Sequence, residues 1–215
     1  MYLLKWVPLS ALVVLMLVSA FSGYLRKHEL IYRENGVLEI VSVVLWCIGA
    51  LLGFWAAFRK GTAENRLLAF LMATIALLAA LREVDAHIWL NPQHFGPLGV
   101  RYRLDWWVYA EVSLAVKLGW ALVFLSIMTS LAYPLIRLRR PLYHALRAGA
   151  PVPLLILAAV LFLGLGFALD DLLRHSTWVA SETRQLMEET AEVLGAVLYL
   201  IAVIVHVRGG GIAPR

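Results

Sequence analysis

Long apolar runs alternate with short polar stretches along the whole chain. A helix that crosses a membrane needs about 20 mostly apolar residues, because each residue adds about 1.5 Å of rise. Six segments reach or approach that length: Leu3–Phe21, Val37–Phe58, Leu67–Ile88, Trp106–Tyr133, Pro151–Leu169 and Thr190–Val207. The pattern predicts an all-α, polytopic membrane helix bundle with about six transmembrane helices.

Two of these segments have unusual features. In the segment Leu67–Ile88, the apolar run stops at Leu81 and the charged stretch Arg82-Glu-Val-Asp85 follows. We therefore expect this helix to continue past the charges into the membrane interface. The segment Leu3–Phe21 has Lys5 near its start and a Val18-Ser-Ala20 stretch that suits signal-peptide cleavage. Its apolar run is long for a cleaved signal. We therefore expect a retained helix, with cleavage as the alternative.

The stretch from Pro134 to Gly149 mixes basic and apolar residues. One interpretation is a segment that lies along the cytoplasmic surface and contacts anionic lipid headgroups. The other, which we favour, is a positively charged loop that fixes the topology. Residues 209–215 are expected to form a flexible tail that follows a single transmembrane domain of residues 1–208.

The composition supports the bilayer interpretation. Of the 215 residues, 62% are apolar and 15% are charged, and the mean hydropathy is +0.80, whereas a soluble domain has about 25% charged residues. A net charge of +5 suggests nucleic-acid binding in a soluble protein. Here the basic residues fall in short loops and act as orientation signals, so no nucleic-acid partner is expected. The lone Cys47 excludes a disulfide within the chain and a cysteine-based metal site.

The basic residues also predict the orientation of the chain. The densest cluster, from Arg137 to Arg147, falls in a loop that six spans place on the same side as both termini. Positively charged loops stay in the cytoplasm. We therefore expect a multi-pass inner-membrane protein with both termini in the cytoplasm. Its expected partners are membrane lipids and either another membrane protein or a second copy of the chain.

Acidic residues gather on the opposite side. Of the 14 acidic residues, only Glu64 falls in a predicted cytoplasmic loop. The helix dipole stabilises a carboxylate near a helix N-terminus, and this accounts for Glu39, Glu188 and Glu189. It does not account for carboxylates at helix C-terminal ends or deep inside a helix, namely Glu83, Asp85, Glu111, Asp170, Asp171 and Glu192. These carboxylates need partners or water.

Spacing indicates which of these residues converge. Glu83 and His87 are four residues apart and share a helix face, and the same spacing joins Glu188 and Glu192. In a compact bundle we expect one cavity that opens to the outer side, with Arg82 as the countercharge. Its expected lining is Glu39, Glu83, His87, Glu111 and Glu192, with Asp85, Glu188 and Glu189 close by.

Three functions fit such a cavity. The acids form a structural network with nearby arginines, or they shuttle protons or bind a cation during transport. In the third possible function, Glu83, His87 and Glu39 hold a divalent metal such as zinc. Glu111 or Glu192 would then act as the base of a metal-assisted hydrolase with a lipid-like substrate. The general expectation is a membrane component that binds a ligand, metal or partner at this site.

Lys117 is the other charge that needs an explanation. It lies eleven residues into the fourth predicted helix, near the middle of the bilayer, where a charge is costly and usually faces the bundle interior. Six residues separate it from Glu111, a rotation of about 240°, so the two do not share a face. We expect Lys117 to be buried between helices and to pair with an acidic or carbonyl group of a different helix.

Three short motifs occur together in this chain: Glu34-Asn-Gly-Val-Leu-Glu39, Arg82-Glu-Val-Asp85 and Glu188-Glu-Thr-Ala-Glu192. Together they resemble a group of bacterial multi-pass inner-membrane proteins of unknown function, which have an E-[DN]-G-x-x-E segment and an E-E-x-x-E segment. The resemblance implies an inner-membrane location and no particular activity.

Overall fold

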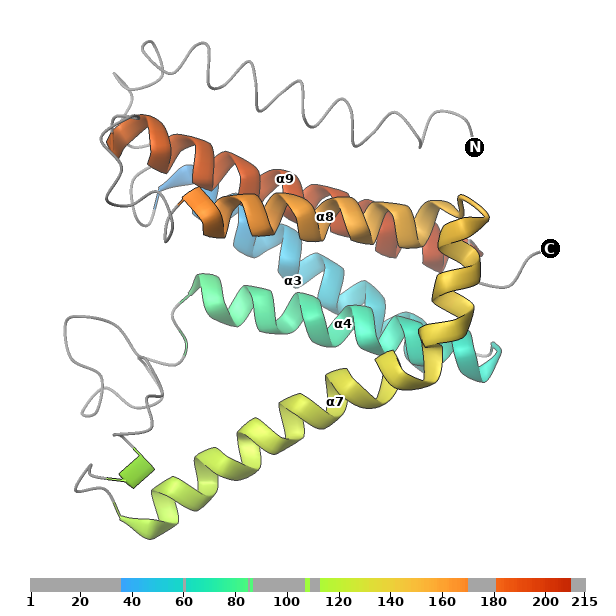
Figure 1. Ribbon diagram of the computed structural model, residues 1–215, viewed down its shortest axis with the longest axis horizontal. Helices are drawn as coiled ribbons and strands as arrows, with labels where there is room; N and C mark the ends of the chain where they lie inside the picture. Colours follow the sequence, from blue (N-terminus) through green and yellow to red (C-terminus); the bar gives the residue numbers. More distant parts are fainter. Residues whose placement is uncertain are drawn as a thin grey trace.

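The computed structural model describes residues 36–59, 61–84, 86, 107–108, 113–169 and 181–209. These residues are helical apart from short turns and caps, which confirms the all-α class (Figure 1). The described helices are α3 (Val37–Phe58), α4 (Ala63–Glu83), α7 (Leu114–Arg147), α8 (Pro151–Phe167) and α9 (Ser181–Val207).

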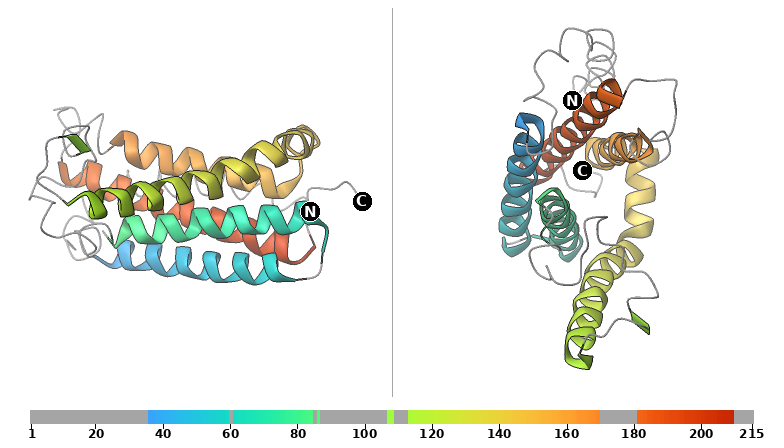
Figure 2. Two further views of the ribbon diagram at one scale, coloured as in Figure 1. Left: turned by 90° about the horizontal axis from the view of Figure 1, so that it is seen from below. Right: turned by 90° about the vertical axis from the view of Figure 1, so that its left-hand side faces the viewer.

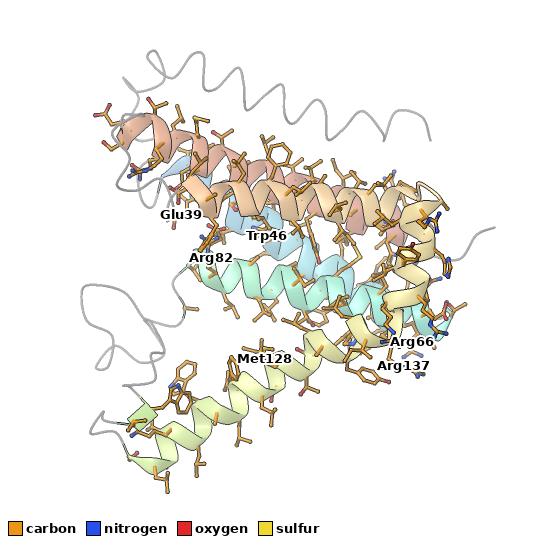
Figure 3. The ribbon with its side chains drawn as sticks, viewed as in Figure 1. Glu39, Trp46, Arg66, Arg82, Met128 and Arg137 are labelled. Atoms are coloured by element: carbon orange, nitrogen blue, oxygen red, sulfur yellow. The ribbon has the colours of Figure 1, made fainter. Side chains whose placement is uncertain are left out.

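Successive described helices run in opposite directions, so their ends gather at two ends of a bundle (Figures 1 and 2). We call one the acidic end, because Glu39, Glu83 and Glu192 lie there with Arg82. The other is the basic end, with Arg59, Arg66, Arg137 and Arg147. Figure 3 labels Glu39 and Arg82 at one end and Arg66 and Arg137 at the other. Among the described residues, the acidic side chains expected on one side, Glu39, Glu83, Glu182, Glu188, Glu189 and Glu192, belong to the helix ends that meet at the acidic end.

Small residues let α3 and α4 approach closely. A Cβ atom built on Gly53 would lie 2.9 Å from Ala73 Cβ and 3.0 Å from the Ala73 backbone, whereas one built on Gly49 would lie 3.6 Å from Ala76 Cβ. Gly195 has the same role between α9 and α8, since its Cβ would lie 3.0 Å from Leu163 Cγ. Membrane helices commonly use glycine and alanine in this way, because apolar contacts between helices gain little over contacts with lipid.

An aromatic pair joins three helices in the centre of the bundle. The rings of Trp46 on α3 and Tyr199 on α9 are both buried, with centroids 5.1 Å apart. The Tyr199 hydroxyl donates a hydrogen bond of 2.9 Å to the carbonyl oxygen of Met72 on α4. A buried hydroxyl needs such a partner, and here the bond fixes the depth of α9 relative to α4.

The helix α7 differs most from expectation. It continues through Pro134 and Pro141 to Arg147, so the stretch that we favoured as a loop is helical. Prolines inside a helix remove backbone hydrogen bonds and bend it, and Figure 1 shows α7 turning across the bundle near its C-terminal end. In this part Leu138 and Ala145 are buried while the arginines are exposed. The segment is therefore an amphipathic helix at the basic end.

The first half of α7 has little contact with the other helices. It diverges from α4 toward the acidic end (Figures 1 and 2), and none of its most apolar 18-residue stretch is buried. Several of its large apolar side chains, among them Leu122, Phe124 and Leu125, are more than 60% exposed. A surface of this kind is unfavourable in water and suits a lipid environment.

Four described helices, α3, α4, α7 and α9, are long and apolar enough to cross a membrane, which is compatible with an integral membrane protein. The apolar α8 has 17 residues and is shorter than the other four. The predicted span Leu3–Phe21 lies outside the described residues, so the expected number of six spans stays a prediction.

Candidate functional site

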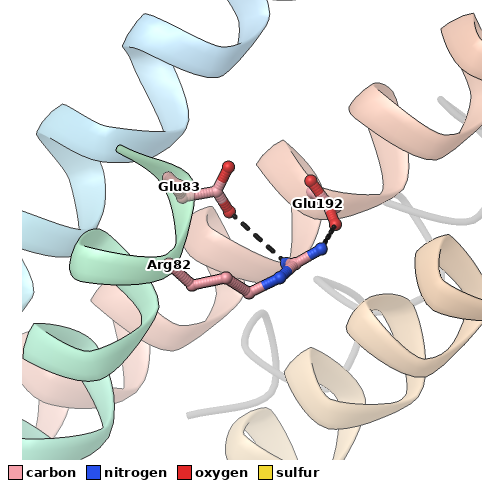
Figure 4. Close-up of polar contacts among 3 residues, drawn as sticks. All are labelled: Arg82, Glu83 and Glu192. Carbon is pink, nitrogen blue, oxygen red and sulfur yellow. Dashed lines mark hydrogen bonds and ion pairs between the residues drawn. The ribbon is translucent and has the colours of Figure 1, made fainter. Parts of the chain in front are cut away.

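An ion pair joins α4 and α9 at the acidic end. Arg82 lies in the last turn of α4, and its Nη2 atom donates a hydrogen bond of 2.9 Å to Glu192 Oε1 on α9 (Figure 4). Its Nη1 atom lies 3.8 Å from Glu83 Oε1 on the same helix. One guanidinium therefore serves two carboxylates. A charge-assisted bond of this length is among the stronger hydrogen bonds in proteins.

The two partners of this bond differ in exposure. The Glu192 side chain is 7% exposed and that of Arg82 is 60% exposed. Gly166 on α8 makes room for Glu192, because a Cβ atom at this position would lie 3.1 Å from Glu192 Cγ. The carboxylate is thus enclosed by the bundle, while part of the guanidinium remains open to its surroundings.

Other carboxylates lie within electrostatic range of this pair. Glu83 interacts electrostatically with Glu192 and Glu39 as well as with Arg82. Glu189 interacts with Glu192, Glu188, Glu39 and Glu83. The structure therefore brings together Glu39 from α3, Glu83 from α4 and Glu188, Glu189 and Glu192 from α9.

The observed helix ends change the explanation for two of these acids. The helix α9 begins at Ser181, not near Thr190, so Glu188 and Glu189 lie about two turns inside it. The helix dipole acts mainly in the first turn and does not account for them, which makes that part of our prediction wrong. The account holds for Glu39, which lies in the first turn of α3.

At the other helix end, α4 ends at Glu83 with Val84 as its C-cap, and most of the predicted continuation to Ile88 lies outside the described residues. Glu83 therefore lies at a helix C-terminus, where the dipole disfavours a carboxylate. Arg82, which the dipole favours there, compensates it. This need for a partner was expected from the sequence.

Lys117 has a carbonyl partner, as expected, but it lies nearer the helix N-terminus than expected. Its Nζ atom donates a hydrogen bond of 3.0 Å to the carbonyl oxygen of Trp107. However, α7 begins at Leu114, so Lys117 lies in the first turn and not near the middle of a helix. The acceptor Trp107 precedes α7 and is itself helical, so the carbonyl partner comes from outside the helix of Lys117, whereas Lys117 is half-buried and not fully enclosed between helices.

Three predicted site residues, Asp85, His87 and Glu111, lie outside the described residues. The proposed zinc ligands Glu39, Glu83 and His87 are therefore only partly placed. In the part of the chain that the structure describes, no group of three or more His, Cys, Asp or Glu side chains is arranged to hold a metal ion.

A second polar site, at the basic end, was not foreseen. Arg59, Arg66 and His206 line one small cavity there. From the sequence alone, the two arginines are explained as orientation signals, and His206 has no neighbouring polar residue that suggests a site. Their spacing in the sequence does not link them, because they lie at the ends of three different helices that meet in the fold.

Comparison with protein-family models, with curated proteins and with solved structures finds no match for this chain.

Proposed function

We propose that this chain is a multi-pass inner-membrane protein that binds a positively charged ligand or partner group at its acidic end. The observation that carries the proposal is the sharing of Arg82 between Glu83 and Glu192, with Glu192 enclosed by the bundle. Glu189 adds a further carboxylate that interacts with four others. Neighbouring carboxylates repel one another, and a cation between them relieves that repulsion.

The exposure of Arg82 supports an accessible site. The Arg82 side chain is 60% exposed while that of Glu192 is almost fully buried, so the open side of the ion pair is the guanidinium. A ligand cation that approaches from the open side meets Arg82 first and must compete with it for the carboxylates. Cation binding and the Arg82–Glu192 bond are therefore coupled.

The test uses the purified full-length chain in detergent, with Zn²⁺, Mn²⁺ and spermidine as probes. A ligand at 100 times its dissociation constant stabilises a folded protein by about 2.7 kcal/mol. We expect at least one probe to raise the unfolding temperature of the wild type with saturation. Glu83→Gln and Glu189→Gln should weaken this response, since each removes a negative charge at nearly constant volume.

Glu64→Gln is the matched control. Glu64 lies in the first turn of α4 at the basic end and is exposed, so its removal should leave the response unchanged. If no probe stabilises the wild type, or if Glu64→Gln has the same effect as Glu83→Gln, the proposal is wrong. If Glu83→Gln only lowers the unfolding temperature and leaves the response to the probes intact, the cluster is a structural network.

A further inference from the structure

A cavity of about 180 Å³ lies at the basic end, between the C-terminal ends of α3 and α9 and the N-terminal end of α4. Its lining includes Arg59, Gly61, Asn65, Arg66, His206 and Gly209. A water molecule occupies about 30 Å³ in the liquid, so the space is ample for a group of about five non-hydrogen atoms.

Both arginines are held in place by partners that leave their charge uncompensated. Arg66 Nε donates a hydrogen bond of 3.1 Å to the carbonyl oxygen of Ala57, and the guanidinium carbon of Arg59 lies 3.7 Å from the ring centroid of Trp55. Neither a carbonyl group nor an indole ring neutralises a guanidinium. Within the described residues neither arginine forms an ion pair.

Two of the backbone carbonyl oxygens beside the cavity already accept hydrogen bonds from backbone amides. The carbonyl oxygen of Ala56 accepts from the Arg59 amide, and that of His206 accepts from the Gly209 amide. The N-terminus of α4 presents the positive end of a helix dipole, but the C-termini of α3 and α9 present negative ends, so the positive charge of the cavity comes from the two arginines and not from the helix dipoles. The N-cap of α4 is Thr62, whose hydroxyl accepts from the Asn65 amide.

His206 adds a further polar group. The residue is 8% exposed, and its Nε2 atom lies 3.0 Å from the carbonyl oxygen of Asn65. A carbonyl oxygen only accepts hydrogen bonds, so Nε2 carries the hydrogen. Its Nδ1 atom is buried and has no hydrogen-bond partner among the described residues.

We propose that this cavity binds a phosphate group, of the kind carried by an anionic phospholipid or by a soluble phosphate ester. Two arginines whose Nη donors have no hydrogen-bond partner among the described residues match the oxygens of a phosphate, which guanidinium groups bind in a bidentate manner. The exposed arginines of the amphipathic part of α7 lie at the same end of the bundle as the cavity (Figure 3).

The experiment compares two probes on the purified full-length chain. Inorganic phosphate is titrated against sodium chloride of equal ionic strength, with the unfolding temperature as readout. In mixed micelles, phosphatidylglycerol is compared with diacylglycerol of the same acyl chains, and native mass spectrometry counts the lipids retained. We expect a saturable effect of one or both phosphate-containing probes on the wild type. Arg59→Gln and Arg66→Gln should weaken binding by about tenfold or more, since each removes charge-assisted hydrogen bonds.

Arg140→Gln is the control, because Arg140 is an exposed arginine of α7 that does not line the cavity. Retention of phosphatidylglycerol alone identifies a lipid headgroup as the ligand, and a response to inorganic phosphate alone identifies a soluble ester. Among the described residues the Arg59 side chain makes no hydrogen bond to the bundle and contacts only the Trp55 ring, so Arg59→Gln tests the site even if Arg66→Gln fails to fold. No effect of either probe on the wild type, or an equal loss in Arg140→Gln, overturns the proposal.

Discussion

The Arg82–Glu192 bond shows how one buried charge is accommodated. Burying a carboxylate without a partner costs several kcal/mol, and Glu192 avoids this by accepting a hydrogen bond from a guanidinium that keeps much of its own solvent contact. The desolvation cost therefore falls mainly on one of the two ions. The arrangement also leaves Arg82 able to exchange partners, as a binding site at this position requires.

Two glycines of α3 offer a matched test of close packing. We expect Gly53→Ala to destabilise the protein by about 1–3 kcal/mol, because its Cβ would lie 2.9–3.0 Å from Cβ and backbone atoms of Ala73, which cannot move aside cheaply. Gly49→Ala places its Cβ at an ordinary 3.6 Å from Ala76. It should be neutral or stabilise the protein by up to about 1 kcal/mol, because alanine favours helix.

Thermal unfolding of both variants in the same detergent provides the measurement. Equal unfolding temperatures for the two alanine variants would show that α3 and α4 are farther apart than the structure indicates.

At the scale of the helices, apolar runs were good guides to where helices are and poor guides to where they end. Val37–Phe58 has the predicted bounds, because turn residues follow its apolar run. The helix α9 begins nine residues before the predicted Thr190, since Ser181–Glu189 is mostly polar and its two apolar residues, Leu186 and Met187, do not make an apolar run. With 27 residues, α9 is about 40 Å long, so part of it extends beyond a hydrocarbon core of about 30 Å.

The same reasoning explains which site residues were predictable. Glu83 and Glu192 were predictable because the cost of an unpaired charge can be estimated from its position in a helix. Arg82 was predictable because it is the cation nearest to Glu83 in the sequence. The cavity at the basic end depends on how three helix ends meet. Arg59, Arg66 and His206, taken one at a time, each have an ordinary explanation, so the cavity that they line could not be predicted without the fold.

The amphipathic part of α7 predicts a labelling pattern. With Cys47 replaced by serine, we expect Arg139→Cys to react with a membrane-impermeant maleimide and Leu138→Cys to be protected, because Arg139 is exposed and Leu138 is 1% exposed. If the stretch were an extended loop, neighbouring positions would react at similar rates. Similar reactivity of the two cysteines would therefore contradict the helix.

At the scale of the molecule, the alternating directions of the helices fix which connections share a side. The α3–α4 connection at Gly61 and the α7–α8 connection at Gly149 both lie at the basic end (Figures 1 and 3). Positively charged connections remain in the cytoplasm. We therefore expect reporter fusions after Gly61 and after Gly149 to report the cytoplasm, and a fusion after Pro97 to report the opposite side.

These fusions check the predicted topology independently of any ligand. A fusion after Gly61 that reports the same side as one after Pro97 would remove α4 as a transmembrane helix. Opposite reports from Gly61 and Gly149 would instead show that the number of crossings between them is odd.

The opposite charges of the two ends also respond to voltage. An energised cell membrane holds a potential across its hydrocarbon layer, and moving one elementary charge through 100 mV changes its energy by about 2.3 kcal/mol. Guanidinium groups on the electrically negative side and carboxylates on the positive side both lower the energy of the molecule. An inverted molecule with the same packing would have a higher energy in the same field. The arginines of the basic end thus favour one orientation for as long as the membrane stays energised, after the chain has been inserted.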